Sequence, residues 1–268
     1  MAEAFQGPVV LVGCGRLGSA IAEGWLATGA VDPADLIILT PSSKPIAEAA
    51  QARGARINPE PAVLAQARAV VLSVKPAMWR AVSKPIAASF AADAVIVSVM
   101  AGVRADLIGA AYPGRPVARV MPTTGVATGQ GIAAIWSADA GARAVAHGLF
   151  DALADVVDLN EEGQMDAATA VAGSGPAYVH AFARALAQGG IDAGLDEASA
   201  LRLARGAIRS AAAADPSETL DALIARVASP GGTTEAGLKA LNADQALDQA
   251  VGAAVASALN RARELSRD

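Results

Sequence analysis

One stretch decides the fold of this chain: Val9-Val10-Leu11-Val12-Gly13-Cys14-Gly15-Arg16-Leu17-Gly18. A short apolar run leads into glycines spaced GxGxxG, and a helical pattern follows over residues 19–26. Glycines at these positions permit a tight turn, close approach of a pyrophosphate to the backbone, and close packing of helix on strand. The stretch predicts a dinucleotide site formed by Gly13, Cys14, Gly15, Arg16, Leu17 and Gly18, with Cys14 as a small filler rather than a reactive thiol. The alternative is a glycine-rich turn that binds nothing.

The first half of the chain continues this pattern. Short Val, Ile and Leu runs alternate with helical patterns, at residues 9–12, 36–39, 69–73, 95–99, 117–121 and 132–136. Such unalternated apolar runs are typical of strands covered on both faces, as in a parallel sheet with crossover helices. The pattern predicts an α/β Rossmann domain, doubly wound and with a mainly parallel sheet.

The second half is predicted to be all-α. Ser174-Gly175-Pro176 is expected to start one helix and Gly189-Gly190 to stop it. Asp196 is expected to start the next helix, Asp215-Pro216 to end it, and Asp244 to cap the last. The boundary is placed at Glu161-Glu162-Gly163, which gives a dinucleotide-binding domain over residues 1–161 and a helical domain over residues 162–268.

Composition narrows the class of protein. The chain is 53% hydrophobic with 3% aromatic residues, so closely packed aliphatic cores are expected. A formal charge of −5, without a block of basic residues, disfavours nucleic acid and anionic membranes as partners. The longest uncharged stretch, residues 120–138, is interrupted by proline and glycines and predicts strands and loops rather than a membrane span.

The cysteine and histidine content bears on disulfides, metal sites and cellular location. The single cysteine, Cys14, cannot form an internal disulfide, and the two histidines stand far apart in the sequence. No metal site is therefore expected. The chain also lacks an N-terminal charged region followed by an apolar segment, so a secretory signal is not expected. These features predict a soluble, cytoplasmic protein.

The end of the second predicted strand indicates which dinucleotide binds. A site for NAD usually places an acid there to accept a hydrogen bond from the ribose 2′-hydroxyl, but this strand ends at Thr40 and continues Pro41-Ser42-Ser43-Lys44. Hydroxyls and a cation without an acid suit a 2′-phosphate. NADPH is therefore expected, with NADH as the alternative, and Thr40, Ser42, Ser43 and Lys44 as contacts. Pro41-Ser42 also fits a simple turn.

Two further strand ends lie at the carboxyl edge of the predicted sheet, where ligands of this fold bind. One is Val74-Lys75-Pro76, in which Lys75 either holds the cofactor or is a solvated loop residue. The other is Met121-Pro122-Thr123, which is expected to face the nicotinamide or the substrate.

A second glycine-rich stretch, Ser229-Pro230-Gly231-Gly232-Thr233-Thr234, lies between helical segments of the second half. Proline and glycines force a tight loop, and the two threonines open an amphipathic helix over residues 235–241. Free amides at a helix start attract a carboxylate. The stretch predicts a carboxylate site; the alternative is a helix-helix turn with a threonine cap.

Five motifs in this order resemble the pyrroline-5-carboxylate reductases across nearly the whole chain. They are Gly13 to Gly18, Ser73-Val74-Lys75-Pro76, Met121-Pro122-Thr123-Thr124, Ala172-Gly173-Ser174-Gly175-Pro176-Ala177-Tyr178 and Ser229 to Thr234. The resemblance implies NAD(P)H-dependent reduction of the cyclic imine 1-pyrroline-5-carboxylate to L-proline, the last step of proline biosynthesis. It also implies a helical domain that joins two chains as a homodimer, which in the family often assembles further into decamers.

The same resemblance implies roles for the second glycine-rich stretch. Ser229, Gly231, Gly232 and Thr233 match the loop that holds the substrate carboxylate, and Thr234 matches the threonine whose hydroxyl faces the ring nitrogen. Thr234 is thus the expected catalytic residue. One departure bears on turnover: many relatives read Met-Pro-Asn-Thr-Pro where this chain has Met121-Pro122-Thr123-Thr124-Gly125.

Three other interpretations stay open at this point. A β-hydroxyacid dehydrogenase shares the architecture but requires a lysine on the long central helix, and residues 176–188 contain none. A reductase of a related cyclic imine differs only in substrate. A non-catalytic NADP sensor leaves the second glycine-rich stretch unexplained. Tyr178 and His180, near the start of the central helix, are expected to be packing or surface residues.

Overall fold

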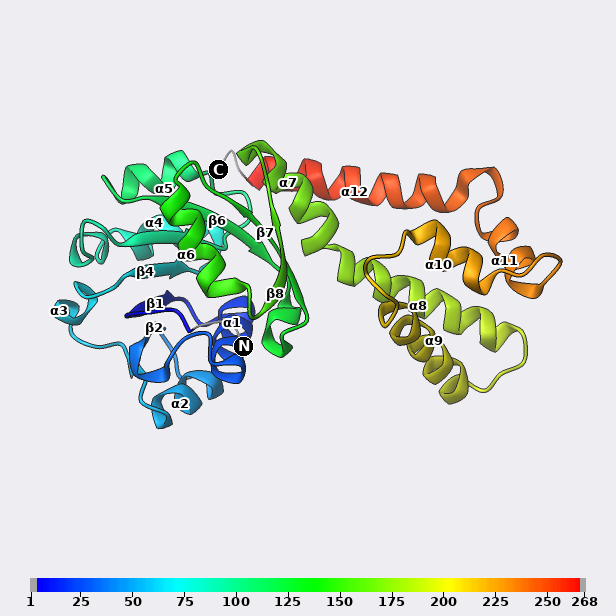
Figure 1. Ribbon diagram of the computed structural model, residues 1–268, viewed down its shortest axis with the longest axis horizontal. Helices are drawn as coiled ribbons and strands as arrows, with labels where there is room; N and C mark the ends of the chain where they lie inside the picture. The colour runs from blue at the N-terminus through cyan, green and yellow to red at the C-terminus, as the bar shows by residue number, and fades with distance from the viewer. Residues whose placement is uncertain (1–3, 266–268) are drawn as a thin grey trace. The chain divides into compact units, whose positions relative to one another are not determined.

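The computed structural model of the chain describes residues 4–265, so the outermost residues of the two predicted domains, 1–3 and 266–268, lie outside it. The chain divides into two compact units (Figure 1). Unit 1 comprises Met1–Gly173 and Ala258–Asp268, and unit 2 comprises Ser174–Ser257.

Unit 1 is built on one sheet of eight strands in the order β3-β2-β1-β4-β5-β6-β7-β8. Neighbouring strands pair in parallel except β6 with β7, which are antiparallel. The predicted mainly parallel, doubly wound sheet is therefore confirmed. The strands are β1 Val9–Val12, β2 Leu36–Leu39, β3 Arg56–Ile57, β4 Ala69–Leu72, β5 Val95–Ser98, β6 Val117–Pro122, β7 Gly131–Trp136 and β8 Ala154–Asp158.

Helices cover both faces of this sheet, which explains the unalternated apolar strands. Val9 and Leu11 of β1 pack in a core with α1, α2 and α6, whereas Val10 and Val12 pack with α3, α4 and α5. A buried hydrogen bond from Trp25 Nε1 to the Leu149 carbonyl, 2.8 Å long, joins α1 to α6. The helices are α1 Arg16–Thr28, α2 Pro45–Ala52, α3 Pro61–Leu64, α4 Trp79–Ser83, α5 Ala105–Ala111 and α6 Ala140–Phe150.

The two strands that the sequence analysis did not predict lie at the edges of the sheet. β3 is only two residues long. β8 carries Asp155 and Asp158, and three of its five residues are exposed. An edge strand with one wet face lacks the apolar run by which the inner strands were recognised.

Unit 2 is helical, as predicted. A short helix, α7 (Met165–Ala168), and a π-helical turn, Thr169–Gly173, lead from unit 1 into it. Its helices are α8 Gly175–Asp192, α9 Glu197–Ala212, α10 Leu220–Val227, α11 Thr233–Leu241 and the first part of α12 Ala246–Leu265. Asp196 caps α9 by accepting a hydrogen bond from the Ser199 amide.

Two details of unit 2 correct the predictions. Gly189-Gly190 does not stop α8, which runs on to Asp192. A Cβ at Gly190 would lie 3.2 Å from Leu195 Cδ1, so glycine here allows the turn after α8 to pack closely and does not end the helix. Asp244 does not cap α12 with its side chain: it has a φ of +54° in the turn Ala243–Gln245, and its carbonyl accepts a hydrogen bond from Gln249 Nε2 at 3.0 Å.

Candidate active site

The first glycine-rich stretch forms the turn between β1 and α1. Gly13 has a φ of +96°, and its amide donates a 2.8 Å hydrogen bond to the Leu39 carbonyl. A Cβ at this position would lie 2.5 Å from the Ser73 carbonyl oxygen, so only glycine fits. The turn brings the start of α1 to the carboxyl ends of β1, β2 and β4.

The space in front of α1 is open. Gly15 is the N-cap of this 13-residue helix, and a Cβ there would meet no atom within 4 Å. No side chain caps the helix, so its first amides carry the positive end of the helix dipole toward this space. A diphosphate fits here because the backbone supplies donors and the missing side chain leaves room.

The residues between these glycines differ in what they present. Cys14 is buried, with its Sγ 3.5 Å from Ser19 Oγ, and therefore offers a ligand only its backbone. Leu17 packs against the core of unit 1. Arg16 is exposed, so its guanidinium is the side chain of this turn that is free to reach an anion.

A cavity of about 300 Å³ lies at the carboxyl end of β2. Its lining includes four predicted cofactor residues, Thr40, Ser42, Ser43 and Lys44, which the fold brings together. The rest of the lining is Pro41 of the same loop, Ala47, Glu48 and Gln51 of α2, Ile57 of β3, and Asn58. The segment after β2 contains no acid, as the sequence analysis noted, but α2 brings the carboxylate of Glu48 into the same cavity.

Asn58 holds the rim of this cavity together. Its Nδ2 donates to the Thr40 carbonyl at 2.8 Å, and its Oδ1 accepts from the Thr40 amide at 2.9 Å. Thr40 is buried, and its Oγ1 donates to the Ser42 carbonyl at 3.0 Å, so this hydroxyl shapes the loop and does not face a ligand. Asn58 has a φ of +44°. The amino-acid sequence does not reveal Asn58 as a loop contact, because the strand before it is only two residues long.

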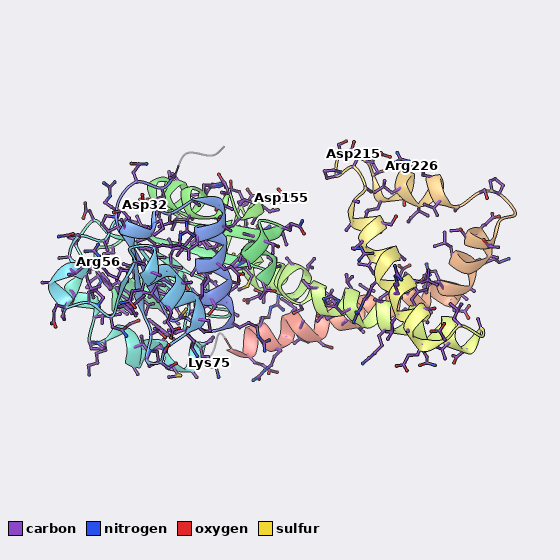
Figure 2. All side chains as sticks on the ribbon, turned by 90° about the horizontal axis from the view of Figure 1, so that it is seen from below. Asp32, Arg56, Lys75, Asp155, Asp215 and Arg226 are labelled. Carbon is purple, nitrogen blue, oxygen red and sulfur yellow. The ribbon has the colours of Figure 1, made fainter. Side chains whose placement is uncertain are left out.

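The end of β4 supplies the next predicted contacts. Val74 packs partly into the core, and Lys75 is exposed at the start of the short helix Pro76–Met78. Lys75 is labelled in Figure 2, which also shows side chains filling the space around the sheet of unit 1.

The end of β6 is more enclosed than expected. Met121 and Pro122 are buried within the strand. Thr123 is buried too, and both its amide and its Oγ1 form hydrogen bonds with the backbone of Ile132, at 3.0 and 3.2 Å. Thr123 thus secures the chain beside β7, while Thr124 is exposed.

The second glycine-rich stretch precedes α11 in unit 2. Gly231 has a φ of +71°, and the Gly232 amide donates to the Ser229 carbonyl at 2.9 Å. Gly232 is the N-cap, Thr233 and Thr234 are the first residues of the helix, and no side chain caps it. The threonine cap considered as an alternative is therefore absent from this helix.

This loop already holds a carboxylate. The Gly231 amide donates a 2.6 Å hydrogen bond to Oε2 of Glu235, in the first turn of α11. Gly231 and Thr233 are exposed, and Thr234 is half-buried. A backbone amide of the loop is thus oriented to bind a carboxyl oxygen.

The central helix α8 presents Tyr178 and His180. Tyr178 is half-buried, and its hydroxyl donates to the Ala254 carbonyl of α12 at 3.5 Å, a packing contact within unit 2. His180 is exposed. Among residues 4–265, no three His, Cys, Asp or Glu side chains are grouped closely enough to hold a metal ion. Over the same residues, no helix is long and apolar enough to cross a membrane.

Two family descriptions match the chain. One, pyrroline-5-carboxylate reductase dimerisation, covers residues 162–265. The other, NADP oxidoreductase coenzyme F420-dependent, covers residues 8–102.

Full-length relatives agree with the first match. A pyrroline-5-carboxylate reductase of Haemophilus influenzae is 31% identical over 96% of this chain and 97% of its own length. One of Thermus thermophilus is 32% identical over 96% of this chain and 98% of its own length. The solved pyrroline-5-carboxylate reductase of Coxiella burnetii has a TM-score of 0.88 at 26% identity and covers 98% of this chain and 99% of its own.

Proposed function

Because the chain belongs to the pyrroline-5-carboxylate reductase family, we propose that residues 229–232, together with Thr233 and Thr234 of α11, bind and orient its imine substrate. The enzyme is an NAD(P)H-dependent oxidoreductase that reduces the C=N bond of 1-pyrroline-5-carboxylate in proline biosynthesis. The dehydrogenase and sensor interpretations are set aside on the same relatives.

The protein itself needs to supply little covalent chemistry for this reaction. The reduced nicotinamide, when bound, supplies the hydride. The proposed task of unit 2 is to hold the substrate carboxylate on the amides around Gly232 and to place the ring for transfer. The Thr234 hydroxyl then hydrogen-bonds the ring nitrogen as it becomes an amine, and either relays a proton from water or orients an imine protonated in solution.

The observation that supports this proposal most directly is the bond between the Gly231 amide and the Glu235 carboxylate. It is an internal example of the interaction proposed for the substrate. Hydrogen bonds to an ionised acceptor are short and strong, as the 2.6 Å distance illustrates. A substrate carboxylate with access to the neighbouring amides has the same chemistry to use.

The test compares Thr234→Ala with Thr233→Ala. Losing one hydrogen bond that strengthens in the transition state should cost roughly 2 to 4 kcal/mol, so Thr234→Ala should lower kcat about 30- to 1,000-fold. The Kd for NADPH should stay unchanged, because this hydroxyl is proposed to contact the substrate and not the cofactor. Thr233→Ala keeps its backbone amide and should have a much smaller effect.

A third variant tests the loop itself. In Gly232→Val the added Cβ would lie 2.6 Å from Ser229 Oγ and 2.9 Å from the Ser229 carbonyl, so the loop must rearrange. We expect a raised KM for the imine. Equal turnover in Thr234→Ala and wild type would leave Thr234 as a helix residue without a catalytic role.

The residues that we propose to bind the cofactor lie in unit 1. We propose that the phosphate groups bind at Gly13, Gly15 and Gly18, and that the cavity after β2 receives the ribose 2′ group. Ser43 and Lys44 favour NADPH over NADH. Replacing Lys44 by Glu should weaken NADPH selectively.

The proposal also covers the oligomeric state of the enzyme and its cellular compartment. The enzyme is a homo-oligomer through the domain matched by the dimerisation family, and we propose the dimer as its unit, with a decamer as the higher form. We keep the domain boundary after residue 161, which the family match from residue 162 supports. The single cysteine suits a reducing cytoplasm.

A further inference from the structure

The cavity after β2 carries two opposite charges. On one side, the loop from Pro41 to Lys44 supplies hydroxyls and the ammonium group of Lys44. On the other side, α2 supplies the carboxylate of Glu48, with Gln51 one turn further on. The formal charge of the lining is therefore balanced, with one cation and one anion.

The acid and one of the hydroxyls are already in contact. Ser43 Oγ donates a hydrogen bond to the Glu48 carboxylate, and both side chains are exposed. The hydroxyl that a 2′-phosphate needs as a donor is therefore satisfied by a protein anion. A bound phosphate must compete with Glu48 for Ser43, and it must do so next to a like charge.

The same carboxylate acts differently on the unphosphorylated cofactor. A ribose 2′-hydroxyl is a hydrogen-bond donor, and a carboxylate at this end of the sheet is the acceptor such a hydroxyl uses. Glu48 thus opposes the 2′-phosphate and accommodates the 2′-hydroxyl. Glu48 lies on α2, after the loop, so the sequence at the end of β2 does not reveal it.

We propose that Glu48 is a specificity-determining residue of the cofactor cavity, whose carboxylate restrains the preference for NADPH and lets the enzyme also use NADH. The inference rests on the proposed function, in which this cavity receives the ribose 2′ group. Asn58 is a positioning residue, because its paired hydrogen bonds to Thr40 hold the loop independently of Glu48. A change at Glu48 should therefore alter the cofactor preference without displacing the loop.

The test is Glu48→Gln, which removes the charge and keeps the shape. At the separation expected across such a cavity, removing one charge opposite a dianion should lower the Kd for NADPH by about 3- to 10-fold at low salt, and by less at high salt. The Kd for NADH should stay the same or rise. Glu23→Gln is the matched control, since Glu23 is an exposed glutamate of α1 outside the cavity lining.

Direct titration of both cofactors keeps the outcome separate from turnover. An unchanged ratio of the two Kd values in Glu48→Gln, or an equal change in Glu23→Gln, overturns the role of Glu48. Ser43→Ala should weaken NADPH and leave NADH nearly unaffected, and the opposite order also overturns it. If the wild-type enzyme binds both cofactors and fails to reduce the imine, the proposed function fails while the binding test of Glu48 still stands.

Discussion

The two glycine-rich loops both lead into a helix, but they differ in their surroundings. At Gly13, in the loop before α1, an added Cβ would lie 2.5 Å from the Ser73 carbonyl of a neighbouring strand end. At Gly231, before α11, it would meet no atom within 4 Å, and at Gly232 the three nearest atoms would all belong to Ser229 of the same loop. The dinucleotide loop is thus completed by its own domain, whereas unit 2 by itself leaves the second loop open.

The hydrophobic cores of the two units also differ, and again unit 2 is the less complete by itself. Unit 1 has large clusters of buried aliphatic and aromatic residues on both faces of its sheet. Within residues 174–257, all of which the structure describes, the buried apolar core is three alanines: Ala187, Ala200 and Ala204. Meanwhile Leu203 is 61% exposed and Val227 is 68% exposed. A helical unit that exposes its large apolar side chains and buries alanines needs another surface to cover it.

The largest expected effect tests this difference with two valines of nearly equal exposure. Val179 on α8 is 44% exposed and Val157 on β8 is 46% exposed. Val179 forms a stripe with Phe182 and Leu186 at helical spacing, all exposed, so Val179→Lys should place a charge in a subunit interface. An uncompensated buried charge costs about 3 kcal/mol or more, which raises the dimer dissociation constant about 100-fold or more.

Analytical ultracentrifugation across protomer concentrations measures that constant. Val157→Lys should leave it unchanged, because an edge strand tolerates lysine on its wet face. The comparison between the units breaks down if both variants dimerise like the wild type, or if Val157→Lys dissociates the protein and Val179→Lys does not.

The next effect concerns the packed loop. A Cβ at Gly18 would clash with the Gly13 carbonyl and lie 3.0 Å from Ser73 Oγ. Gly18→Ala should therefore lower the free energy of unfolding by about 1 to 3 kcal/mol. It should also weaken NADPH binding by a similar free energy. Gly109→Ala, in α5 of the same unit, meets nothing within 4 Å and should stabilise by about 0.5 to 1 kcal/mol.

Urea unfolding at one protomer concentration and cofactor titration provide the two readouts. A Gly18→Ala protein with wild-type stability and wild-type NADPH affinity would show that the loop before α1 is no more constrained than the loop before α11.

The smallest effect distinguishes the surfaces of the two units by their response to pH. In unit 1, partial burial lowers the pKa of His147, but hydrogen bonds and charges from Asp151 and Asp158 outweigh this and raise the pKa above its usual 6.5. A raised pKa in the folded state stabilises the protein below the usual value, and this stabilisation is lost as pH rises through the raised pKa. Stability relative to His147→Gln should therefore be highest near pH 6 and fall as pH increases.

Arg226 of unit 2, paired with Glu218, serves as the control. Arg226→Gln changes no histidine, and histidine is the side chain whose ordinary pKa lies between about pH 5 and 8. Arg226→Gln should therefore differ from wild type by a constant amount between about pH 6 and 8. Thermal unfolding of the three proteins across this range measures both differences. A difference for His147→Gln that does not change with pH would contradict the assignment of charge at His147.

The sequence alone determined the class of each half. Six apolar runs identified the inner strands because residues buried on both faces must all be apolar, and GxGxxG after the first run located the dinucleotide turn. Five short motifs were enough for the family, because each depends on backbone geometry that few residues permit.

Only the tertiary structure decided which side chains meet. Asn58 and Thr40 are 18 residues apart, Arg119 and Glu162 are 43 apart, and both pairs form hydrogen bonds because neighbouring strands and helices bring them together. Glu48 enters the cofactor cavity by the direction in which α2 leaves its loop, and α8 continues through Gly189-Gly190 because the following turn packs closely against it. Periodicity and local propensity describe how one segment is buried, whereas contacts between segments depend on distances that no single segment contains.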